Sequence, residues 1–346
     1  MCQGQGLIME NTNVIEVKKL KKYFPVRSGL FKQKSYFRAV DDVSFTIKQR
    51  SVHALVGESG CGKSTVSRML LRLIQKTDGD VLYKGSEIFG LKGADLKAYR
   101  KAVSIVFQDP YASLNPRMKI LDTLTEPLKI HNMFDRKKYL DIVKNAVNRV
   151  GLPSEILKRY PHEFSGGQRQ RICIARALIL SPEVIVADEP LSSLDVSIQA
   201  QILNLLKGLM DEGQMSMFFI SHDLNVVRYL SDEISVMYLG RIVEQAKTDD
   251  LFNQPLHPYT DMLIEAAPKI RTGASDRHVK DNNIERYTSI DDVSGLKPKA
   301  SNEIFLYSSC SFQPRCHKRM DICALKSPEL VKHNGRLVSC HLFGKK

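Results

Sequence analysis

Nine consecutive residues combine glycines, a lysine and hydroxyls at a spacing that suits a phosphate chain. They read Gly57-Glu58-Ser59-Gly60-Cys61-Gly62-Lys63-Ser64-Thr65. The glycines allow the backbone to fold into a nest of N–H groups aimed at phosphate oxygens, and the helix that follows adds the positive end of its dipole. Lys63 would reach the terminal phosphates, and the Ser64 hydroxyl would ligate Mg²⁺. These residues predict a site for a nucleoside triphosphate and Mg²⁺.

Two adjacent carboxylates follow an apolar run that predicts a buried strand. Residues 184–187 are all apolar, and Asp188 and Glu189 come directly after them. Side chains alternate along a strand, so neighbouring carboxylates point in different directions. We expect Asp188 to bind Mg²⁺ and Glu189 to act as general base for the water that attacks the γ-phosphate. An acidic pair that caps a strand at the surface is the alternative.

A second glycine-containing motif precedes a run with a helical pattern, residues 172–180. The motif is Ser165-Gly166-Gly167-Gln168. A serine followed by two glycines at a helix start provides N–H groups that can bind an anion. Because the chain already carries one phosphate loop, this motif predicts contact with a nucleotide that another subunit binds.

Along the chain, Ser-Gly-Gly-Gln lies between the phosphate loop and the strand that is followed by Asp-Glu. This order of motifs resembles that of the ATP-binding cassette (ABC) ATPases. The resemblance implies that ATP and Mg²⁺ bind between two subunits. It implies that Gln108 contacts Mg²⁺ or the attacking water, that Asp195 belongs to a loop crossing the dimer interface, and that His222 contacts the γ-phosphate. Phe24 matches the aromatic residue that stacks on adenine, with Tyr23 as the alternative.

The expected residues fall into three groups. The catalytic ones are Lys63, Gln108, Glu189 and His222, and the Mg²⁺ ligands are Ser64, Gln108 and Asp188. The nucleotide-binding ones are the whole phosphate loop, Gln108, Asp195, the aromatic pair Tyr23 and Phe24, and the signature Ser165, Gly166, Gly167 and Gln168.

Three further segments narrow the resemblance to ATPase subunits of bacterial oligopeptide and dipeptide importers. They are residues 107–116, 161–164 and 256–260, and the resemblance covers about residues 13–346. Nickel and other small-solute importers share much of this pattern and are an alternative.

The closer resemblance also implies a set of partners. They are a second, homologous ABC ATPase subunit, two transmembrane permease subunits and an extracytoplasmic solute-binding protein. A non-transport ABC ATPase acting on nucleic acid or ribosomes is the other alternative. Such relatives usually carry a long coiled coil or two cassettes, and this chain has neither.

The elements that must position these residues alternate between strand and helix patterns, which is typical of an α/β fold. We expect an ABC ATPase domain over 13–250, with a phosphate-loop core formed by 13–108 and 181–250. Residues 109–180 predict a helical insertion that carries the signature, and the resemblance implies a RecA-like core with an antiparallel β subdomain. Residues 251–346 predict a small cysteine-containing extension, with a polar linker at 271–302.

Four cysteines lie close together near the C-terminus: Cys310, Cys316, Cys323 and Cys340. Thiolates suit zinc and iron–sulfur clusters, although the spacing lacks the C-x2-C pairs of common zinc sites. The resemblance implies a [4Fe–4S] cluster in some peptide-importer ATPases, at positions that these four cysteines match. Zinc, and either no metal or reversible oxidation of the thiols, are the alternatives.

Composition bounds the remaining possibilities. The 346 residues are 43% hydrophobic and 26% charged, as in an ordinary globular protein, and the net charge is +13. The basic clusters are not interleaved with aromatic residues, so we expect no nucleic-acid partner. No apolar run approaches the roughly 18–20 residues of a membrane helix, and the N-terminus has no secretion signal. We therefore expect a peripheral protein at the cytoplasmic face of the cell membrane, held there by partners.

Overall fold

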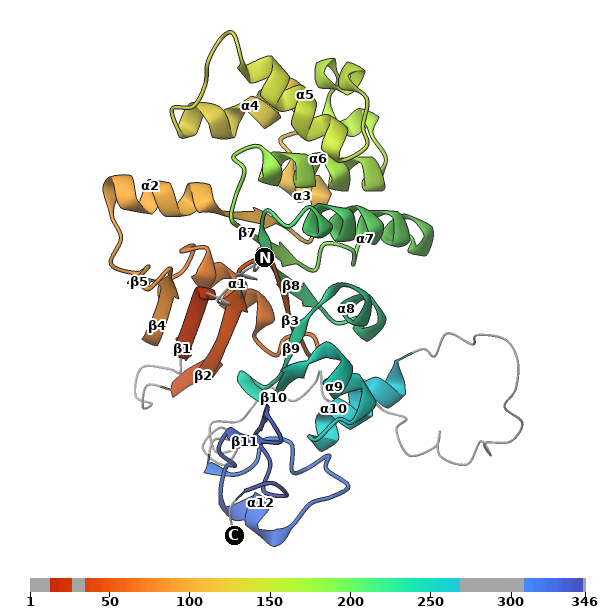
Figure 1. Ribbon diagram of the computed structural model, residues 1–346. Coiled ribbons are helices and arrows are strands. Elements are labelled where there is room, and N and C mark those ends of the chain that lie inside the picture. The colour runs from red at the N-terminus through yellow and green to blue at the C-terminus, as the bar shows by residue number, and fades with distance from the viewer. Residues whose placement is uncertain (1–12, 27–34, 268–307, 345–346) are drawn as a thin grey trace, which may run out of the picture.

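A central sheet carries the strands whose ends form the candidate site. The computed structural model describes residues 13–26, 35–267 and 308–344, so the expected linker at 271–302 lies outside the described residues (Figure 1). The central sheet has eight strands in the order β11-β12-β10-β9-β3-β8-β7-β6. Their bounds are β3 Val52–Val56, β6 Val103–Val106, β7 Val184–Asp188, β8 Ser216–Ser221, β9 Glu233–Tyr238, β10 Arg241–Lys247, β11 Val331–His333 and β12 Arg336–Val338.

The middle of this sheet is parallel and fully buried. Strands β6, β7, β8, β3 and β9 pair in parallel, and every residue of β3, β7 and β8 is buried. Parallel strands covered on both faces need continuous apolar runs, which explains the unbroken apolar sequence of residues 184–187. Their carboxyl ends meet at one edge, where Asp188 ends β7.

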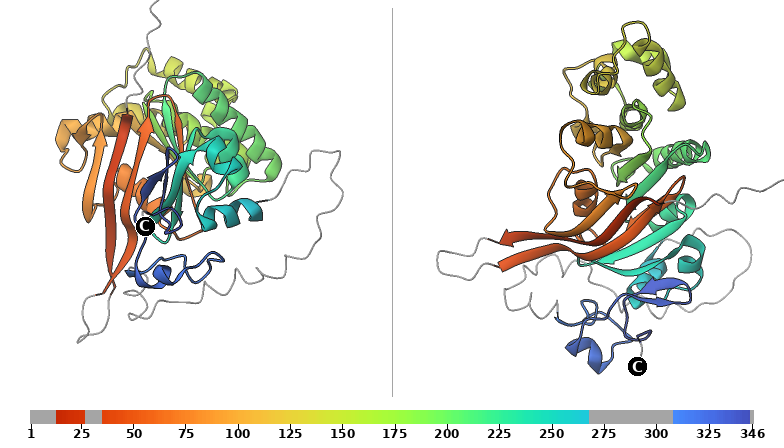
Figure 2. Two further views of the ribbon diagram at one scale, coloured as in Figure 1. Left: turned by 60° about the horizontal axis from the view of Figure 1, so that its bottom comes forward. Right: turned by 60° about the vertical axis from the view of Figure 1, so that its left-hand side comes forward.

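A second sheet of four antiparallel strands lies beside the first in the order β2-β1-β4-β5. The strands are β1 Asn13–Val26, β2 Ser35–Lys48, β4 Asp78–Tyr83 and β5 Ser86–Glu87. One hydrophobic cluster joins this sheet to helix α1 (Lys63–Leu70) and to one face of the central sheet. Figure 2 shows β1 and β2 as a long twisted ribbon that extends beyond the central sheet.

The residues between β6 and β7 form a helical region at the top of Figure 1. It contains α3 Pro110–Ser113, α4 Ile120–Ile130, α5 Tyr139–Arg149 and α6 Gly166–Leu178, with two 3-10 turns at Ser154–Lys158 and Pro161–Glu163. The remaining helices of the described residues are α2 Gly93–Ala102, α7 Val196–Asp211, α8 Leu224–Leu230, α9 Thr248–Asn253, α10 Pro258–Ala266 and α12 Asp321–Leu325. Among the described residues, none of the helices has the length and apolar character to cross a membrane.

The end of the chain returns to the central sheet. Strand β12 pairs antiparallel with β10, with Val338 opposite Glu244, and β11 pairs with β12. The cysteine-containing residues and α12 lie below this sheet in Figure 1. Residues 308–344 are therefore joined to the central sheet by backbone hydrogen bonds.

Candidate active site

The phosphate loop connects β3 to α1, and its shape requires glycine at two points. Gly57 and Gly62 have φ of +156° and +112°, in the region that favours glycine. A Cβ at Gly57 would lie 2.2 Å from the carbonyl oxygen of Met237, and one at Gly62 would lie 2.2 Å from that of Ala39. The loop is therefore packed directly against neighbouring backbone.

Lys63 is enclosed by the loop that it follows. Its side chain is 3% exposed, and Nζ donates to the carbonyl oxygens of Gly57 at 2.8 Å and Glu58 at 3.0 Å. The same Nζ lies 3.9 Å from Oε1 of Glu189. A buried ammonium group needs such partners, and together they hold its charge at the mouth of the loop.

Asp188 faces α1, where two hydroxyls donate to it. Ser64 Oγ donates to Oδ1 at 3.2 Å, and Ser67 Oγ donates to Oδ2 at 2.8 Å. Burial raises the pKa of Asp188, and the two serine hydrogen bonds partly offset this. A carboxylate and a hydroxyl are hard oxygen ligands that fit Mg²⁺, and a cation here would favour the charged form of Asp188. Ser67 was missed by the sequence reasoning, although its i+3 spacing from Ser64 on a helix was a usable signal.

Glu189 points away from Asp188 and lies among three other candidate residues. Its carboxylate accepts a hydrogen bond from Gln108 Nε2 at 3.3 Å, and it lies 3.4 Å from His222 Nδ1 and 3.9 Å from Lys63 Nζ. Its backbone has φ of +47°, which is uncommon for a non-glycine residue, and its N–H donates to Ile220 O at 3.0 Å. The structure thus brings Lys63, Gln108, Glu189 and His222 together.

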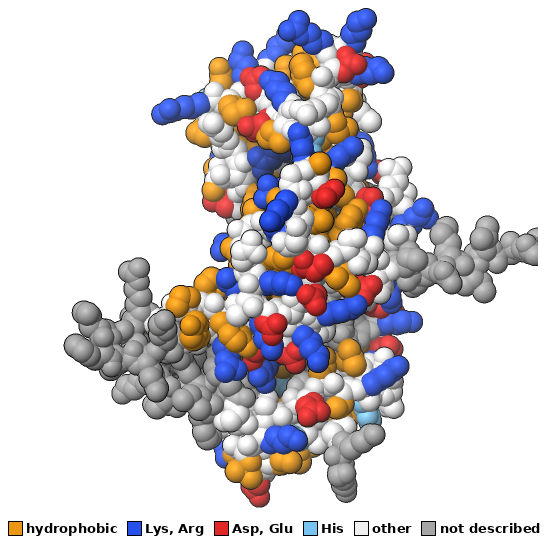
Figure 3. Space-filling model, turned by 90° about the vertical axis from the view of Figure 1, so that its left-hand side faces the viewer, with side chains coloured by type: hydrophobic (Ala, Val, Ile, Leu, Met, Phe, Trp, Pro, Cys, Tyr) orange, Lys and Arg blue, Asp and Glu red, His pale blue; other side chains and the backbone are white. Residues whose placement is uncertain are grey.

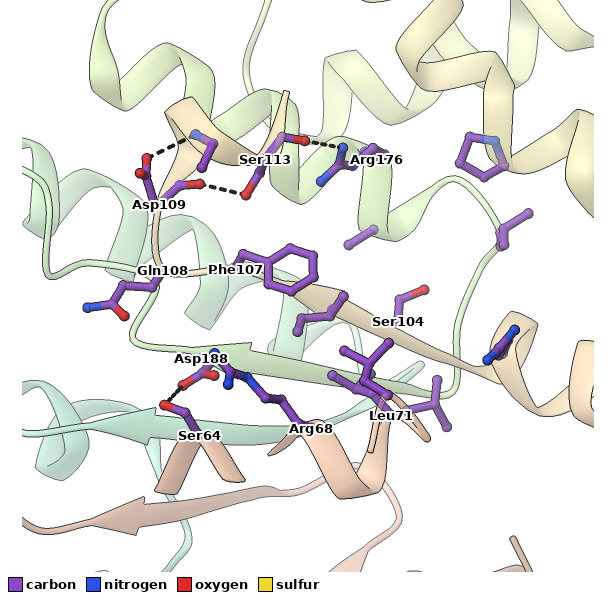
Figure 4. A pocket seen from close by; sticks show the side chains of 18 residues that line it. Ser64, Arg68, Leu71, Ser104, Phe107, Gln108, Asp109, Ser113, Arg176 and Asp188 are labelled. Atoms are coloured by element: carbon purple, nitrogen blue, oxygen red, sulfur yellow. Dashed lines mark hydrogen bonds between the residues drawn. The ribbon is translucent and has the colours of Figure 1, made fainter. Parts of the chain in front are cut away.

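An open cleft of about 680 Å³ begins beside this group and runs toward the helical region. Figure 4 shows Ser64, Asp188 and Arg68 on one side of the cleft and Asp109, Ser113 and Arg176 on the other. Arg176 of α6 donates to Ser113 O at 2.6 Å, and the Asp109 side chain caps α3. The cleft therefore lies between the core and the helical region, with Gln108 in its lining.

The signature residues start α6. Ser165 is the N-cap of this helix: its Oγ accepts from Gln168 N at 3.4 Å, while its own N–H donates to Gln168 Oε1 at 3.1 Å. Within the described parts of the chain, the hydrogen bonds of residues 165–168 do not reach residues 57–65. The signature and the phosphate loop of one chain are thus not joined by hydrogen bonds.

Gly167 is closely packed against α7, which leads to a test of the signature helix. A Cβ on Gly167 would lie 2.4 Å from Cγ2 of Ile198. We expect Gly167→Ala to destabilise the protein by about 1–3 kcal/mol, the usual cost of overpacking. Thermal unfolding of Gly167→Ala, Ile198→Ala and the double variant measures this. Ile198→Ala is expected to recover part of the loss in the double variant, and additive losses would contradict the clash.

The aromatic pair of β1 is divided between two environments. Tyr23 OH donates to Asp41 Oδ1 at 2.5 Å, and burial together with this carboxylate raises the pKa of Tyr23 to about 12. Phe24 has no such partner and is 38% exposed, with Lys22 Nζ 4.9 Å from its ring centroid. This arrangement leaves the Phe24 ring accessible to a base, so Phe24 stays our predicted adenine contact.

The loop after β7 is hydrogen-bonded to backbone groups of the same site. Ser192 Oγ donates to Glu189 O at 3.1 Å, and Ser193 Oγ donates to Gln108 O at 3.3 Å. Asp195 is exposed at the N-cap of α7. Its predicted position at a dimer interface requires a second subunit and stays a prediction.

The cysteine segment is gathered around one backbone hydrogen bond, from Cys310 N to Cys323 O at 2.8 Å. Burial, together with the nearby Cys310, Cys316 and Cys323, raises the pKa of Cys340 to about 11. Among the described residues, however, no three or more His, Cys, Asp or Glu side chains are arranged to hold a metal ion. The four thiols are therefore neighbours but do not form a ligand set in this structure.

The surface carries basic side chains without a single basic patch on the face that Figure 3 shows. Lysine and arginine side chains there are interspersed with acidic and apolar ones. This distribution agrees with the charge spread along the sequence.

The fold matches solved structures of ATP-binding cassettes. One is a dimeric post-hydrolysis cassette bound to ADP and Pi, with a TM-score of 0.60 and 26% identity, covering 68% of this chain and 98% of that one. Another is CbiO1 from Clostridium perfringens, with a TM-score of 0.60, 24% identity and coverage of 70% and 91%. The fold and the phosphate loop therefore define an ABC nucleotide-binding domain, as the sequence predicted.

Comparisons along the sequence narrow the class. Residues 40–192 match the family model "ABC transporter", and residues 243–323 match "Oligopeptide/dipeptide transporter, C-terminal region". The oligopeptide transport ATP-binding protein AppF of Bacillus subtilis is 44% identical over 95% of this chain and 97% of its own length. The dipeptide transport ATP-binding protein DppF of Haemophilus influenzae is 43% identical over 96% and 98%. The chain belongs to the oligopeptide and dipeptide transport ATP-binding proteins of the ABC transporter family.

Proposed function

We propose that this protein hydrolyses ATP to energise the import of oligopeptides or dipeptides through partner membrane subunits. The observation that carries the catalytic part is the position of the Glu189 carboxylate, 3.3 Å from Gln108 Nε2, 3.4 Å from His222 Nδ1 and 3.9 Å from Lys63 Nζ. The proposal that the transported solutes are peptides is supported by the match of residues 243–323 to the oligopeptide/dipeptide transporter C-terminal region. It is also supported by the relatives named for oligopeptide and dipeptide transport.

In the proposed reaction, the side chains bind the phosphates, activate the attacking water and hold Mg²⁺. Lys63 binds the β- and γ-phosphates, and the loop N–H groups hold the phosphate chain in line. Glu189 accepts the proton of the attacking water at a carboxylate oxygen, while Gln108 and His222 fix the position of that carboxylate and water. Mg²⁺ would be held by Ser64, Gln108 and Asp188, and it would supply positive charge for the phosphate oxygens.

The site is proposed to be completed by a second ABC ATPase subunit. Ser165, Gly166 and Gly167 offer a helix start to an anion, and hydrogen bonds within the chain leave them separate from its own phosphate loop. A related cassette has been solved as a dimer with ADP and Pi. ATP would then join two subunits, with its differential affinity for the closed pair driving closure. We propose a homologous partner rather than a second copy.

The cleft between the core and the helical region is the proposed docking site for a permease subunit. It is lined by Gln108 and by residues of α6, so a segment seated there contacts both the candidate site and the signature helix. Movement of the helical region could thereby pass to two permease subunits, and an extracytoplasmic solute-binding protein would deliver the peptide. This arrangement places the protein peripherally at the cytoplasmic face of the membrane.

The proposed function is tested by co-purification and transport. Tagged protein isolated in mild detergent is expected to retain permease subunits and to hydrolyse ATP faster in the presence of the solute-binding protein and peptide. Cells lacking the gene are expected to lose uptake of labelled peptides. Recovery of DNA or ribosomes in place of permeases, or peptide uptake unchanged by the deletion, would overturn the proposal.

We further propose that Cys310, Cys316, Cys323 and Cys340 hold a [4Fe–4S] cluster, with zinc as the alternative metal. Their grouping within one small segment, where Cys310 N donates to Cys323 O at 2.8 Å, supports this. Protein purified without oxygen is expected to contain iron and sulfide in equal amounts, and chelation to release them and expose four reactive thiols. Zinc alone would select the alternative, and a metal-free, fully folded protein would contradict both.

A further inference from the structure

The phosphate loop is contacted by a side chain that lies far from it in the sequence. The guanidinium of Arg315 forms an ion pair with the Glu58 carboxylate through two atoms: Nη1 donates to Oε2 at 3.1 Å, and Nη2 lies 3.0 Å from Oε1. A bidentate pair of this kind fixes orientation as well as distance. Glu58 is the second residue of the phosphate loop, and Arg315 lies between Cys310 and Cys316.

A second C-terminal contact holds the backbone of the same residue. The N–H of Glu58 donates to the hydroxyl of Tyr259 at 3.0 Å. Tyr259 is fully buried, and its ring packs against Tyr238 and Phe312 at centroid distances of 4.6 Å and 5.4 Å. Because Arg315 N donates to Phe312 O, the aromatic cluster also supports the turn that carries Arg315.

Tyr259 itself has a fixed position. The buried Glu244 carboxylate accepts hydrogen bonds from the N–H groups of Leu256 and His257, and His257 Nδ1 caps the N–H of Tyr259 at 3.0 Å. These hydrogen bonds give residues 256–260 a structural role. In the sequence, the same segment indicated only the resemblance to peptide-importer ATPases. Tyr259, which contacts the Glu58 N–H, is therefore held in place by hydrogen bonds that involve Glu244 of β10 and His257 at the start of α10.

Glu58 also contacts the residue that is proposed to bind phosphate. Its carbonyl oxygen accepts from Lys63 Nζ at 3.0 Å. Glu58 therefore has three partners: Arg315 pairs with its carboxylate, Tyr259 accepts from its N–H, and Lys63 donates to its carbonyl oxygen. Holding Glu58 in place restricts the loop before ATP arrives, which lowers the ordering cost of binding.

We propose that Arg315 is a positioning residue for ATP binding, through which the C-terminal cysteine segment sets the affinity of the phosphate loop. The inference rests on the proposed ATPase function. Arg315 pairs with Glu58 and not with the proposed catalytic residues, so its effect falls on ATP affinity rather than on the chemical step. Any rearrangement of Cys310 or Cys316 would move the turn between them and change this contact.

The experiment is a double-mutant cycle measured in the full chain. Arg315→Ala and Glu58→Gln are each expected to raise the Kd and KM for ATP by about 3–5-fold, the upper range for a partly exposed ion pair. The kcat is expected to change by less than about 2-fold because the catalytic group is untouched. The double variant is expected to bind ATP no more weakly than either single variant, since both remove the same pair.

The controls separate this role from a general loss of stability. Arg319→Ala removes an exposed arginine from the same segment and is expected to leave ATP affinity unchanged. Arg315→Lys keeps the charge without the bidentate geometry and is expected to recover part of the affinity. Unchanged Kd in Arg315→Ala, or additive losses in the double variant, would overturn the inference. Absence of ATP binding in the unmodified protein would instead refute the proposed function.

Discussion

Replacement of Glu189 by glutamine is expected to lower kcat for ATP hydrolysis by about 100-fold or more, the usual contribution of a general base. Glutamine keeps the size of the side chain but cannot take a proton from water. Since Asp188, Ser64 and the phosphate loop are unchanged, ATP is expected to bind with nearly its normal Kd. Steady-state hydrolysis by the chain with its partner subunits, and equilibrium binding of a fluorescent ATP analogue, measure the two quantities.

The matched control for this variant lies at the other end of β7. Glu183 precedes the strand and pairs with Lys84 at the surface, where both side chains are more than 40% exposed. Glu183→Gln is expected to leave kcat unchanged. Near-normal turnover in Glu189→Gln would rule out its role as the base.

The same variant is expected to accumulate a closed pair of subunits. If ATP joins the phosphate loop of one subunit to the Ser165 motif of another, blocked hydrolysis keeps that pair together. Size-exclusion chromatography of the chain mixed with its partner ATPase subunit, with ATP and Mg²⁺, is expected to show a stable pair for Glu189→Gln and a transient one for the unmodified protein. Identical elution with and without ATP would contradict the shared site.

The core of the candidate site could be predicted because its parts are local in sequence. The phosphate loop sits between a strand and a helix, Asp188 ends an apolar strand, and Glu189 follows it directly; parallel strands then bring such ends to one edge. Alternation along the strand also predicted that the two carboxylates diverge, although not the φ of +47° at Glu189. The overall ABC fold was implied by the resemblance of these motifs, in their order, to the ABC ATPases.

The contacts of Glu58 could not be predicted in this way. Tyr259 is separated from it by 201 residues and Arg315 by 257, and only the packing of the C-terminal segments joins them. An isolated arginine between two cysteines has no periodicity that would indicate a partner. The spacing of the four cysteines likewise indicated metal ligands but did not fix where their side chains lie.

Replacement of Lys63 by alanine is expected to weaken ATP binding by about 100-fold, the value of roughly two charge-assisted hydrogen bonds. The Lys63 side chain is 3% exposed, and its ammonium donates to the carbonyl oxygens of Gly57 and Glu58 inside the loop. Its removal leaves these oxygens without that donor and removes the charge that faces the phosphates. Equilibrium binding of labelled ATP, with and without Mg²⁺, measures the loss.

Two comparisons make the Lys63 result specific. Lys84→Ala removes a surface lysine paired with Glu183 and is expected to bind ATP normally. Lys63→Arg keeps the charge, but a planar guanidinium does not reproduce the compact ammonium between Gly57 and Glu58, so we expect it to recover little affinity. Because the alanine variant loses binding itself, ATP is expected to stabilise the unmodified protein against heat but not Lys63→Ala. Equal thermal stabilisation of both proteins by ATP would show that Lys63 does not hold the nucleotide.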